Sequence, residues 1–311
     1  MKHPIFLSVL WVAFCTSFAF SQSQTSLDDL VAPETKAVVL GEGYTFCEGP
    51  AADSLGNIYF SDGTHDTIHF YPHGQAVQKF VTDSFDANGM MFNPRGELCV
   101  CEGAAFQVVA IHPRTKEKRI LVDKIEGGRF NEPNDLTFDA TGGFYFTDPN
   151  YKHRGQETVR KEDVYYVSNT GEVSRVSTVC KQPNGILLTP DDQFLYVADC
   201  ADQKIYRYKV DGPGLLSDER LWIDLGAHPD GMTLDVHGNL YMGCGPAGVL
   251  IYDKEGKRIG VLSKDHGIPY ASNCVFGGPN FSILYITAAS RFLGIPTKTE
   301  GIKSRHFELV P

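Results

Sequence analysis

The feature that most constrains this chain is one pattern of turn, short apolar strand, polar turn and second strand, which occurs six times. The first copy extends from Glu48 to Asp62 and ends on an acid. The six copies start at Glu48, Asn88, Asn134, Asn184, Asp230 and Asn273, so the intervals between them are 40, 46, 50, 46 and 43 residues. Repeats of this length that contain only strands and turns are typical of the four-stranded blade of a propeller.

The sequence therefore predicts an all-β fold, a six-bladed β-propeller over residues 36–311. Outer strands with alternating polarity are expected between the copies, for example at Thr67–Tyr71 and Val249–Tyr252. A ring of blades must close, because otherwise two sheet edges stay exposed. We expect an N-terminal strand within Lys36–Tyr44 to pair with the last blade and close the ring. Two β-sandwich domains are the alternative, but no linker divides the chain.

Residues 1–21 are typical of a secretory signal. Lys2 precedes an apolar run that is too short to span a membrane, and Ala19 and Ser21 offer a cleavage site of small residues. A membrane anchor is the less favoured interpretation. We therefore expect an exported protein, periplasmic or secreted, without membrane contact after cleavage. Residues 22–35 are expected to form a flexible segment before the propeller.

The formal net charge of −10 argues against some classes of partner. Without long basic clusters the chain cannot neutralise a run of phosphates, so neither a nucleic acid nor an anionic membrane surface is expected. Cys15 lies in the signal, which leaves seven cysteines. This odd number implies at least one free thiol, and most of the seven are expected to be small buried residues on strands. We expect a monomer or a weak oligomer.

The residues that start the six copies should lie together, because the innermost strand of every blade lines the central channel. We call these six the axial residues. Each one is a carboxylate or an amide, with no lysine or arginine among them. Converging oxygen donors suit a hard divalent cation, calcium more than zinc. Asn-Gly and Asp-Gly are also common turn dipeptides, but their recurrence at equivalent positions favours a metal site.

A second set of acids closes four of the copies: Asp62, Glu102, Asp148 and Asp199. We expect these acids to form another ring at the far end of the inner strands. We predict that they accept hydrogen bonds that link neighbouring blades.

Four segments resemble the hallmark motifs of the gluconolactonase and senescence-marker-protein (regucalcin) family: Glu48-Gly49-Pro50, Pro133-Asn134-Asp135, Pro183-Asn184-Gly185 and Pro229-Asp230-Gly231. The resemblance covers nearly all of the chain after the signal. It implies a six-bladed propeller with one calcium ion held by Glu48, Asn134, Asn184 and Asp230; Zn²⁺, Mn²⁺ and Mg²⁺ are the alternative cations. It further implies a carboxylic-ester hydrolase that opens a sugar lactone, with Asp230 as the catalytic base or water-orienting group.

One departure from the family pattern affects the transfer of roles. Some family members have Arg-x-Asn-Asp where this chain has Arg129-Phe130-Asn131-Glu132-Pro133-Asn134-Asp135. We assign the metal role to Asn134, which makes Arg129 and Asn131 candidate substrate contacts. The other candidate substrate contacts are Asn88, Tyr151, His228 and Asn273.

Two other functions compete with lactone hydrolysis. A cation that polarises a lactone carbonyl for attack by water would serve a phosphoryl oxygen equally well, so an organophosphate or other ester hydrolase is one alternative. A non-enzymatic propeller that binds a ligand on one face is the other. Metal analysis separates this last class from the two hydrolases, and a substrate panel separates the hydrolases from each other.

Overall fold

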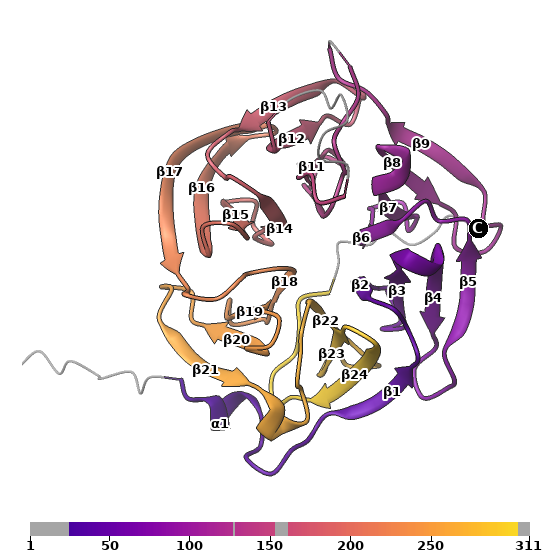
Figure 1. The fold of residues 1–311 in the computed structure, drawn as a ribbon. Helices are drawn as coiled ribbons and strands as arrows, with labels where there is room; N and C mark the ends of the chain where they lie inside the picture. The colour runs from indigo at the N-terminus through magenta and orange to yellow at the C-terminus, as the bar shows by residue number, and fades with distance from the viewer. Residues whose placement is uncertain (1–24, 127, 153–160, 304–311) are drawn as a thin grey trace, which may run out of the picture.

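The computed structural model describes residues 25–126, 128–152 and 161–303, and places six four-stranded antiparallel sheets around a common axis (Figure 1). The predicted six-bladed β-propeller is confirmed. The predicted signal over residues 1–21 lies outside the described residues. No helix among the described residues is long and apolar enough to cross a bilayer.

Each blade contains four strands in order from the axis to the rim. The innermost strands are β2 (Cys47–Ala52), β6 (Ala87–Phe92), β10 (Leu136–Phe138), β14 (Pro183–Leu188), β18 (Met232–Leu234) and β22 (Asn273–Gly277). The second strands are β3 (Ile58–Asp62), β7 (Leu98–Glu102), β11 (Phe144–Asp148), β15 (Phe194–Asp199), β19 (Leu240–Gly243) and β23 (Ile283–Ala288).

The two remaining strands of each blade lie farther from the axis. The third strands are β4 (Thr67–Tyr71), β8 (Gln107–Ile111), β12 (Asp163–Val167), β16 (Lys204–Gly212), β20 (Val249–Tyr252) and β24 (Arg291–Pro296). The outermost strands are β5 (Gln78–Thr82), β9 (Lys118–Val122), β13 (Val173–Ser177), β17 (Leu215–Asp224), β21 (Arg258–Leu262) and β1 (Val38–Glu42). The predicted outer strands are therefore the third strands, and a further strand covers each of them.

The ring closes through its first strand. β1 pairs antiparallel with β24, with Val38 opposite Gly294, so the last blade contains one strand from the N-terminal side and three from the C-terminal side. The predicted closure is confirmed. It removes the two sheet edges that an open ring of blades would expose.

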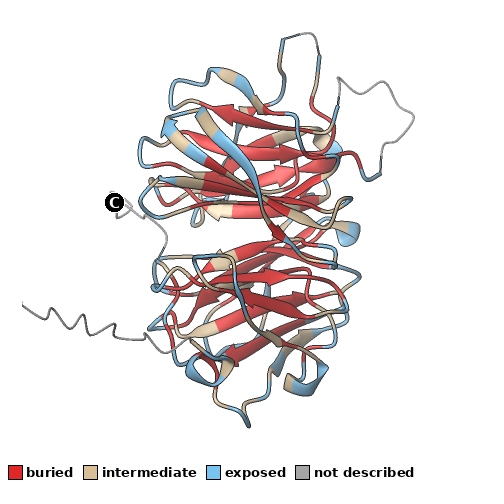
Figure 2. Cartoon of the chain, turned by 90° about the vertical axis from the view of Figure 1, so that its left-hand side faces the viewer, coloured by how far each residue is buried: buried red, intermediate tan, exposed pale blue. Residues whose placement is uncertain are grey.

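The core lies between neighbouring blades rather than inside any one of them. The second strands β3, β7 and β11 are buried at every position, because both faces of each blade pack against another blade. For example, the ring of Tyr59 in the first blade meets that of Phe92 in the second at a centroid distance of 5.3 Å. In the side view the buried strands occupy the middle of the disc and exposed segments lie at its surface (Figure 2).

The segment before the propeller differs from the flexible stretch expected over residues 22–35. A short helix, α1 (Leu27–Leu30), packs near β21, and Leu30 and Val31 are buried against the last two blades. The backbone N–H of Lys298 donates to the carbonyl of Leu30 at 2.7 Å. Apolar burial therefore fixes part of this segment to the propeller. Three 3₁₀ turns complete the described elements, at Gly63–His65, Gly103–Ala105 and Lys264–His266.

Candidate active site at the propeller axis

The six axial residues lie within the first two residues of an innermost strand or two residues before it, and the structure brings them together as predicted. A close approach between inner strands makes this possible. A Cβ atom on Gly49 would lie 1.9 Å from the carbonyl oxygen of Asn88, and one on Gly185 would lie 2.1 Å from that of Asp230. The glycine that follows an axial residue is therefore more than a turn former, because it admits the backbone of the next blade.

A cavity of about 280 Å³ opens over the axial residues. Its lining includes Phe46, Glu48, Gly63, Thr64, Asp86, Ala87, Asn88, Gly103, Glu132, Pro133, Asn134, Tyr151, Lys152, Asn184, Cys200 and Asp230. The four predicted metal ligands are all among them. Cavities of this size with a few converging polar groups are typical small-molecule sites.

Two carboxylates dominate the electrostatics of the cavity floor. Glu48 is buried and accepts a hydrogen bond from the N–H of Gly49 at 3.0 Å. Burial raises the pKa of Glu48, although contacts with Gly49, Ser272 and Asn273 oppose the shift. Burial, and then the charge of Glu48, raise the pKa of Asp230 well above its usual range. Two acids that disfavour each other's charge in this way provide a position where a cation is favoured.

Asp135 is a third acid near the axis, and the sequence had suggested no role for it. It follows Asn134, at the position that glycine occupies after Asn88 and Asn184. Its carboxylate accepts hydrogen bonds from the N–H groups of Leu136 at 2.9 Å and Ile186 at 3.3 Å. Burial raises the pKa of Asp135 to about 7, with these hydrogen bonds opposing and the charge of Glu48 adding to the shift.

Tyr151 lies in the cavity and contacts a predicted metal ligand directly. The Nδ2 atom of Asn184 donates to the hydroxyl oxygen of Tyr151 at 2.9 Å. Because an amide has its oxygen opposite its nitrogen, this bond fixes which way the side chain of Asn184 faces. Burial raises the pKa of Tyr151, so its hydroxyl stays protonated.

The two remaining axial asparagines differ from each other. Asn88 lines the cavity, where a substrate can reach its amide. Asn273 is buried outside the lining; its Oδ1 atom accepts from the N–H of Cys274 at 2.8 Å, and its side chain contacts Glu48. The structure therefore places Asn273 behind Glu48 rather than at the surface that a substrate would meet.

Like Asn273, three further predicted substrate contacts do not line the cavity. The guanidinium of Arg129 lies over the ring of Phe106, 3.7 Å from its centre. Asn131 is buried, and its Nδ2 atom donates to the carbonyl oxygens of Asp148 at 3.2 Å and Lys161 at 3.3 Å. The Nδ1 atom of His228 lies 3.0 Å from the carbonyl oxygen of Cys200. Each of the three side chains therefore lies outside the lining of the cavity and contacts another part of the protein.

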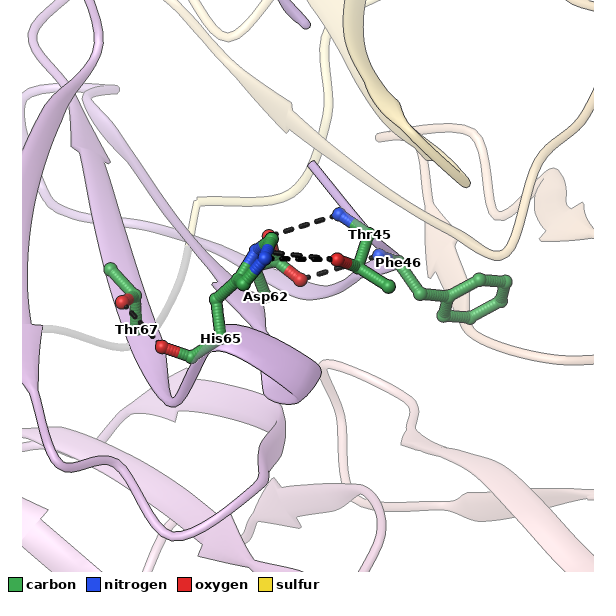
Figure 3. A network of polar contacts seen from close by, with 5 residues as sticks. All are labelled: Thr45, Phe46, Asp62, His65 and Thr67. Atoms are coloured by element: carbon green, nitrogen blue, oxygen red, sulfur yellow. Dashed lines mark hydrogen bonds and ion pairs between the residues drawn. The ribbon is translucent and has the colours of Figure 1, made fainter. Parts of the chain in front are cut away.

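The second set of acids lies at the same end of the inner strands as the axial residues. The prediction that these acids lie at the far end is therefore wrong. Each acid ends a second strand, which is antiparallel to the inner strand, so Asp62 lies opposite Cys47 and Asp199 opposite Pro183. Asp62 accepts from the N–H groups of Thr45 at 3.1 Å and Phe46 at 3.3 Å (Figure 3). These bonds fix the entry into the same blade's inner strand and do not link blades.

The acids at Asp148 and Asp199 act in the same way. Asp148 accepts from the N–H groups of Asn131 at 2.8 Å and Glu132 at 2.9 Å. Asp199 accepts from the N–H of Lys181 at 2.8 Å. Glu102 differs, since its carboxylate binds the side chains of Gln107 and Lys118 instead.

Several cavity residues were not predicted, although the repeat contains a signal for them. Phe46, Asp86 and Glu132 each precede an axial residue by two positions, and Gly63, Gly103 and Cys200 each follow a closing acid. Positions equivalent in the repeat occupy equivalent places around the axis, so both sets could have been found by aligning the six copies.

The cysteines of the described residues are free thiols, and six of the seven are buried, as expected. Cys200 is the exception, because it is half-buried and lines the cavity. Burial raises the pKa of Cys200 to about 11, with the nearby Asp230 adding to the shift. The thiol is therefore protonated at neutral pH, which makes it a poor nucleophile.

Comparison with known proteins assigns the chain to a family. The family model described as SMP-30/Gluconolactonase/LRE-like region matches residues 40–290. The chain belongs to this family. A gluconolactonase of Zymomonas mobilis is 30% identical to it over 305 residues, which cover 88% of this chain and 85% of the relative.

Two further proteins resemble this chain at lower identity. The lactonase drp35 of Staphylococcus aureus is 27% identical, over 69% of this chain and 68% of its own length. The structure of a gluconolactonase from Xanthomonas campestris superposes with a TM-score of 0.79 at 24% identity, covering 87% of this chain and 92% of that one. At this identity the superposition supports the fold alone.

Proposed function

We propose that the chain is a lactone hydrolase, a carboxylic-ester hydrolase that resembles gluconolactonases and acts on a small sugar lactone. The observation that carries the proposal is the axial cavity, in which Glu48, Asp230 and three asparagines converge. Family membership and the activities that the relatives are named for support it. An organophosphate or other ester substrate, and a ligand-binding protein without activity, are the alternatives that the experiments below separate.

The donor set fits a hard divalent cation. In the part of the chain that the structure describes, no three His, Cys, Asp or Glu side chains are grouped as metal ligands. A cation would therefore depend on the amides of Asn134 and Asn184 as well as on Glu48 and Asp230. Carboxylate and amide oxygens are ligands of calcium, so Ca²⁺ is the proposed ion, with Zn²⁺, Mn²⁺ and Mg²⁺ as alternatives.

When bound, such a cation would supply Lewis-acid polarisation of the lactone carbonyl. Glu48 and Asp230 would hold it and balance its charge, and Asn134 and Asn184 would add neutral oxygens. Asp230 would also orient the attacking water or accept its proton. Asn88 offers an amide to the sugar hydroxyls, while the rings of Phe46 and Tyr151 give the cavity an apolar surface.

Removal of the metal tests the proposal. Protein treated with a chelator is expected to lose bound cation, measured by elemental analysis, and to lose hydrolysis of D-glucono-1,5-lactone, measured as acid release. Added Ca²⁺ should restore both. Equal turnover by the metal-free protein would contradict the cation's role. Turnover of phosphotriesters in preference to lactones, or of neither, would favour one of the two alternatives.

Tyr151→Phe should weaken cation binding about tenfold, the lower end of the effect seen when a group that orients a metal ligand is removed. The variant removes the hydroxyl oxygen that accepts the hydrogen bond from the Nδ2 atom of Asn184, so this bond no longer fixes the orientation of the amide. Calorimetry with Ca²⁺ measures the change. Tyr206→Phe, on a third strand away from the cavity, is the matched control, and equal affinities of the two variants would contradict this role.

Export remains a separate proposal, based on residues 1–21. We propose that the protein is periplasmic or secreted, and that it works as a monomer or weak oligomer without a nucleic-acid or membrane partner. The intact mass of protein from the producing cell should correspond to a chain that starts at Gln22. A full-length chain in the cytoplasm would contradict it.

A further inference from the structure

The backbone carbonyls of the three asparagines that line the axial cavity are all bound in the same way. Each carbonyl accepts a hydrogen bond from the blade that comes before it in the chain. The donors are the Oγ atom of Ser61 to Asn88 at 3.2 Å, the N–H of Gly89 to Asn134 at 2.7 Å, and the Oγ1 atom of Thr147 to Asn184 at 2.6 Å. Two of the three donors are therefore side-chain hydroxyls, which a substitution can remove.

Thr147, in β11, connects the two asparagines that are proposed to bind the cation. Its carbonyl accepts from the N–H of Asn134 at 2.9 Å within the third blade, and its hydroxyl reaches the carbonyl of Asn184 in the fourth. The same hydroxyl accepts from the N–H of Asp135 at 3.2 Å. Thr147 is fully buried, so a loss of the hydroxyl would leave buried polar groups of the backbone without a partner.

The side chain and the backbone of Asn184 are held by different groups. Tyr151 binds the amide, whereas Thr147 binds the main-chain carbonyl. A ligand has to be held within about 0.5 Å of its productive position by the residues around it. Because the backbone decides where the side chain of Asn184 begins, the hydroxyl of Thr147 controls a part of the geometry that Tyr151 does not.

Ser61 holds the equivalent position in the first blade. It lies opposite the axial residue Glu48 in the strand pair and is fully buried. Its hydroxyl binds the backbone of Asn88, which is a candidate substrate contact and not a proposed metal ligand. The two equivalent hydroxyls therefore act on residues with different proposed roles, so their effects can be separated.

We propose that these hydroxyls are positioning groups for the next blade: Thr147 for the cation ligand Asn184, and Ser61 for the substrate contact Asn88. The inference rests on the proposed function for the identity of the ion and of the substrate. Neither Thr147 nor Ser61 lines the cavity, so each acts through the asparagine that it binds.

Thr147→Val tests the first role, because valine keeps the shape of threonine and removes only the hydroxyl. Calorimetry should show calcium binding weakened about tenfold, the lower end of the effect seen when a group that orients a metal ligand is lost. Thr147→Ser keeps a hydroxyl and should recover most of the affinity. Ser177→Ala is the matched control, since the hydroxyl of Ser177 joins the same two blades through that of Tyr208 at 2.8 Å. It should lower the melting temperature without a change in affinity.

Ser61→Ala tests the second role. The KM for D-glucono-1,5-lactone should rise about fivefold, the scale of one lost hydrogen bond, while the affinity for calcium stays that of the wild-type protein. Thr147→Val should show the opposite pattern, with weaker calcium binding and a KM close to that of the wild-type protein once calcium is saturating.

A measurement on metal-free protein separates the inference from the proposed activity. The side-chain amide signal of Asn184 in heteronuclear NMR spectra, identified by its loss in Asn184→Asp, should shift in Thr147→Val and stay in place in Ser177→Ala.

Four results would overturn the inference: wild-type calcium affinity in Thr147→Val, an equal weakening in Ser177→Ala, an unchanged KM in Ser61→Ala, or an unmoved Asn184 signal in Thr147→Val. A wild-type protein that binds no calcium and hydrolyses no lactone would instead contradict the proposed function, and the Asn184 signal would still decide the role of Thr147.

Discussion

Asp230→Ala is expected to abolish both cation binding and lactone hydrolysis while the propeller stays folded. The variant removes one of the two carboxylates at the axis and leaves Glu48 to balance a divalent ion alone. Loss of a group that stabilises developing charge costs about 10³-fold in kcat, and loss of the ion itself should cost more. Calcium calorimetry and lactone turnover measure the two effects, and circular dichroism checks the fold.

Asp202→Ala is the matched control, since this acid lies away from the cavity and pairs with Lys181 at 2.6 Å. It should bind calcium and turn over lactone like the wild-type protein. If Asp230→Ala kept its turnover, Asp230 would have no role as base, water-orienting group or ligand.

Gly185→Ala should destabilise the whole propeller, in contrast to Asp230→Ala. The new Cβ would lie 2.1 Å from the carbonyl oxygen of Asp230, so the inner strands β14 and β18 would have to separate. Overpacking of this kind costs about 3 kcal/mol, which for a domain of this size lowers the melting temperature by roughly 5 °C. Thermal unfolding followed by circular dichroism measures the shift.

Calcium binding should weaken together with stability in Gly185→Ala, because Asn184 lies on β14 and Asp230 directly precedes β18. Gly212→Ala is the control, since a Cβ there meets only the Cδ1 atom of Leu215 at 3.7 Å. An unchanged melting temperature for Gly185→Ala would show that the inner strands can separate without cost, contrary to the close approach described above.

The repeat predicted the number of blades and the six residues that meet at the axis. It could do so because a propeller repeats one supersecondary unit around an axis, so equivalent positions in the sequence become equivalent positions in space. Closure of the ring through β1 followed from the same logic, since an open ring would leave two sheet edges unpaired. The roles of Glu48, Asn134, Asn184 and Asp230 as metal ligands remain predictions.

Side chains away from the axis could not be assigned from spacing. Asn131 is near the site in sequence, but the N–H groups of residues 131 and 132 donate to the carboxylate of Asp148. With the backbone held in this way, the side-chain amide of Asn131 binds a backbone carbonyl instead of a substrate. Arg129 stacks on Phe106 because a planar cation gains more there than in solvent. Lys152 and Asp86 meet only because two loops from neighbouring blades reach the same cavity.

The sequence by itself determined the six-bladed propeller and the six oxygen-bearing residues on its axis, because the period of the repeat and the residue at its start are both visible in one dimension. Only the tertiary structure decided which of these residues face a cavity and which lie behind it. Asn88 and Asn273 hold the same place in the repeat, yet one lines the cavity and the other contacts Glu48. That difference arises from packing between blades, which the order of residues along the chain does not reveal.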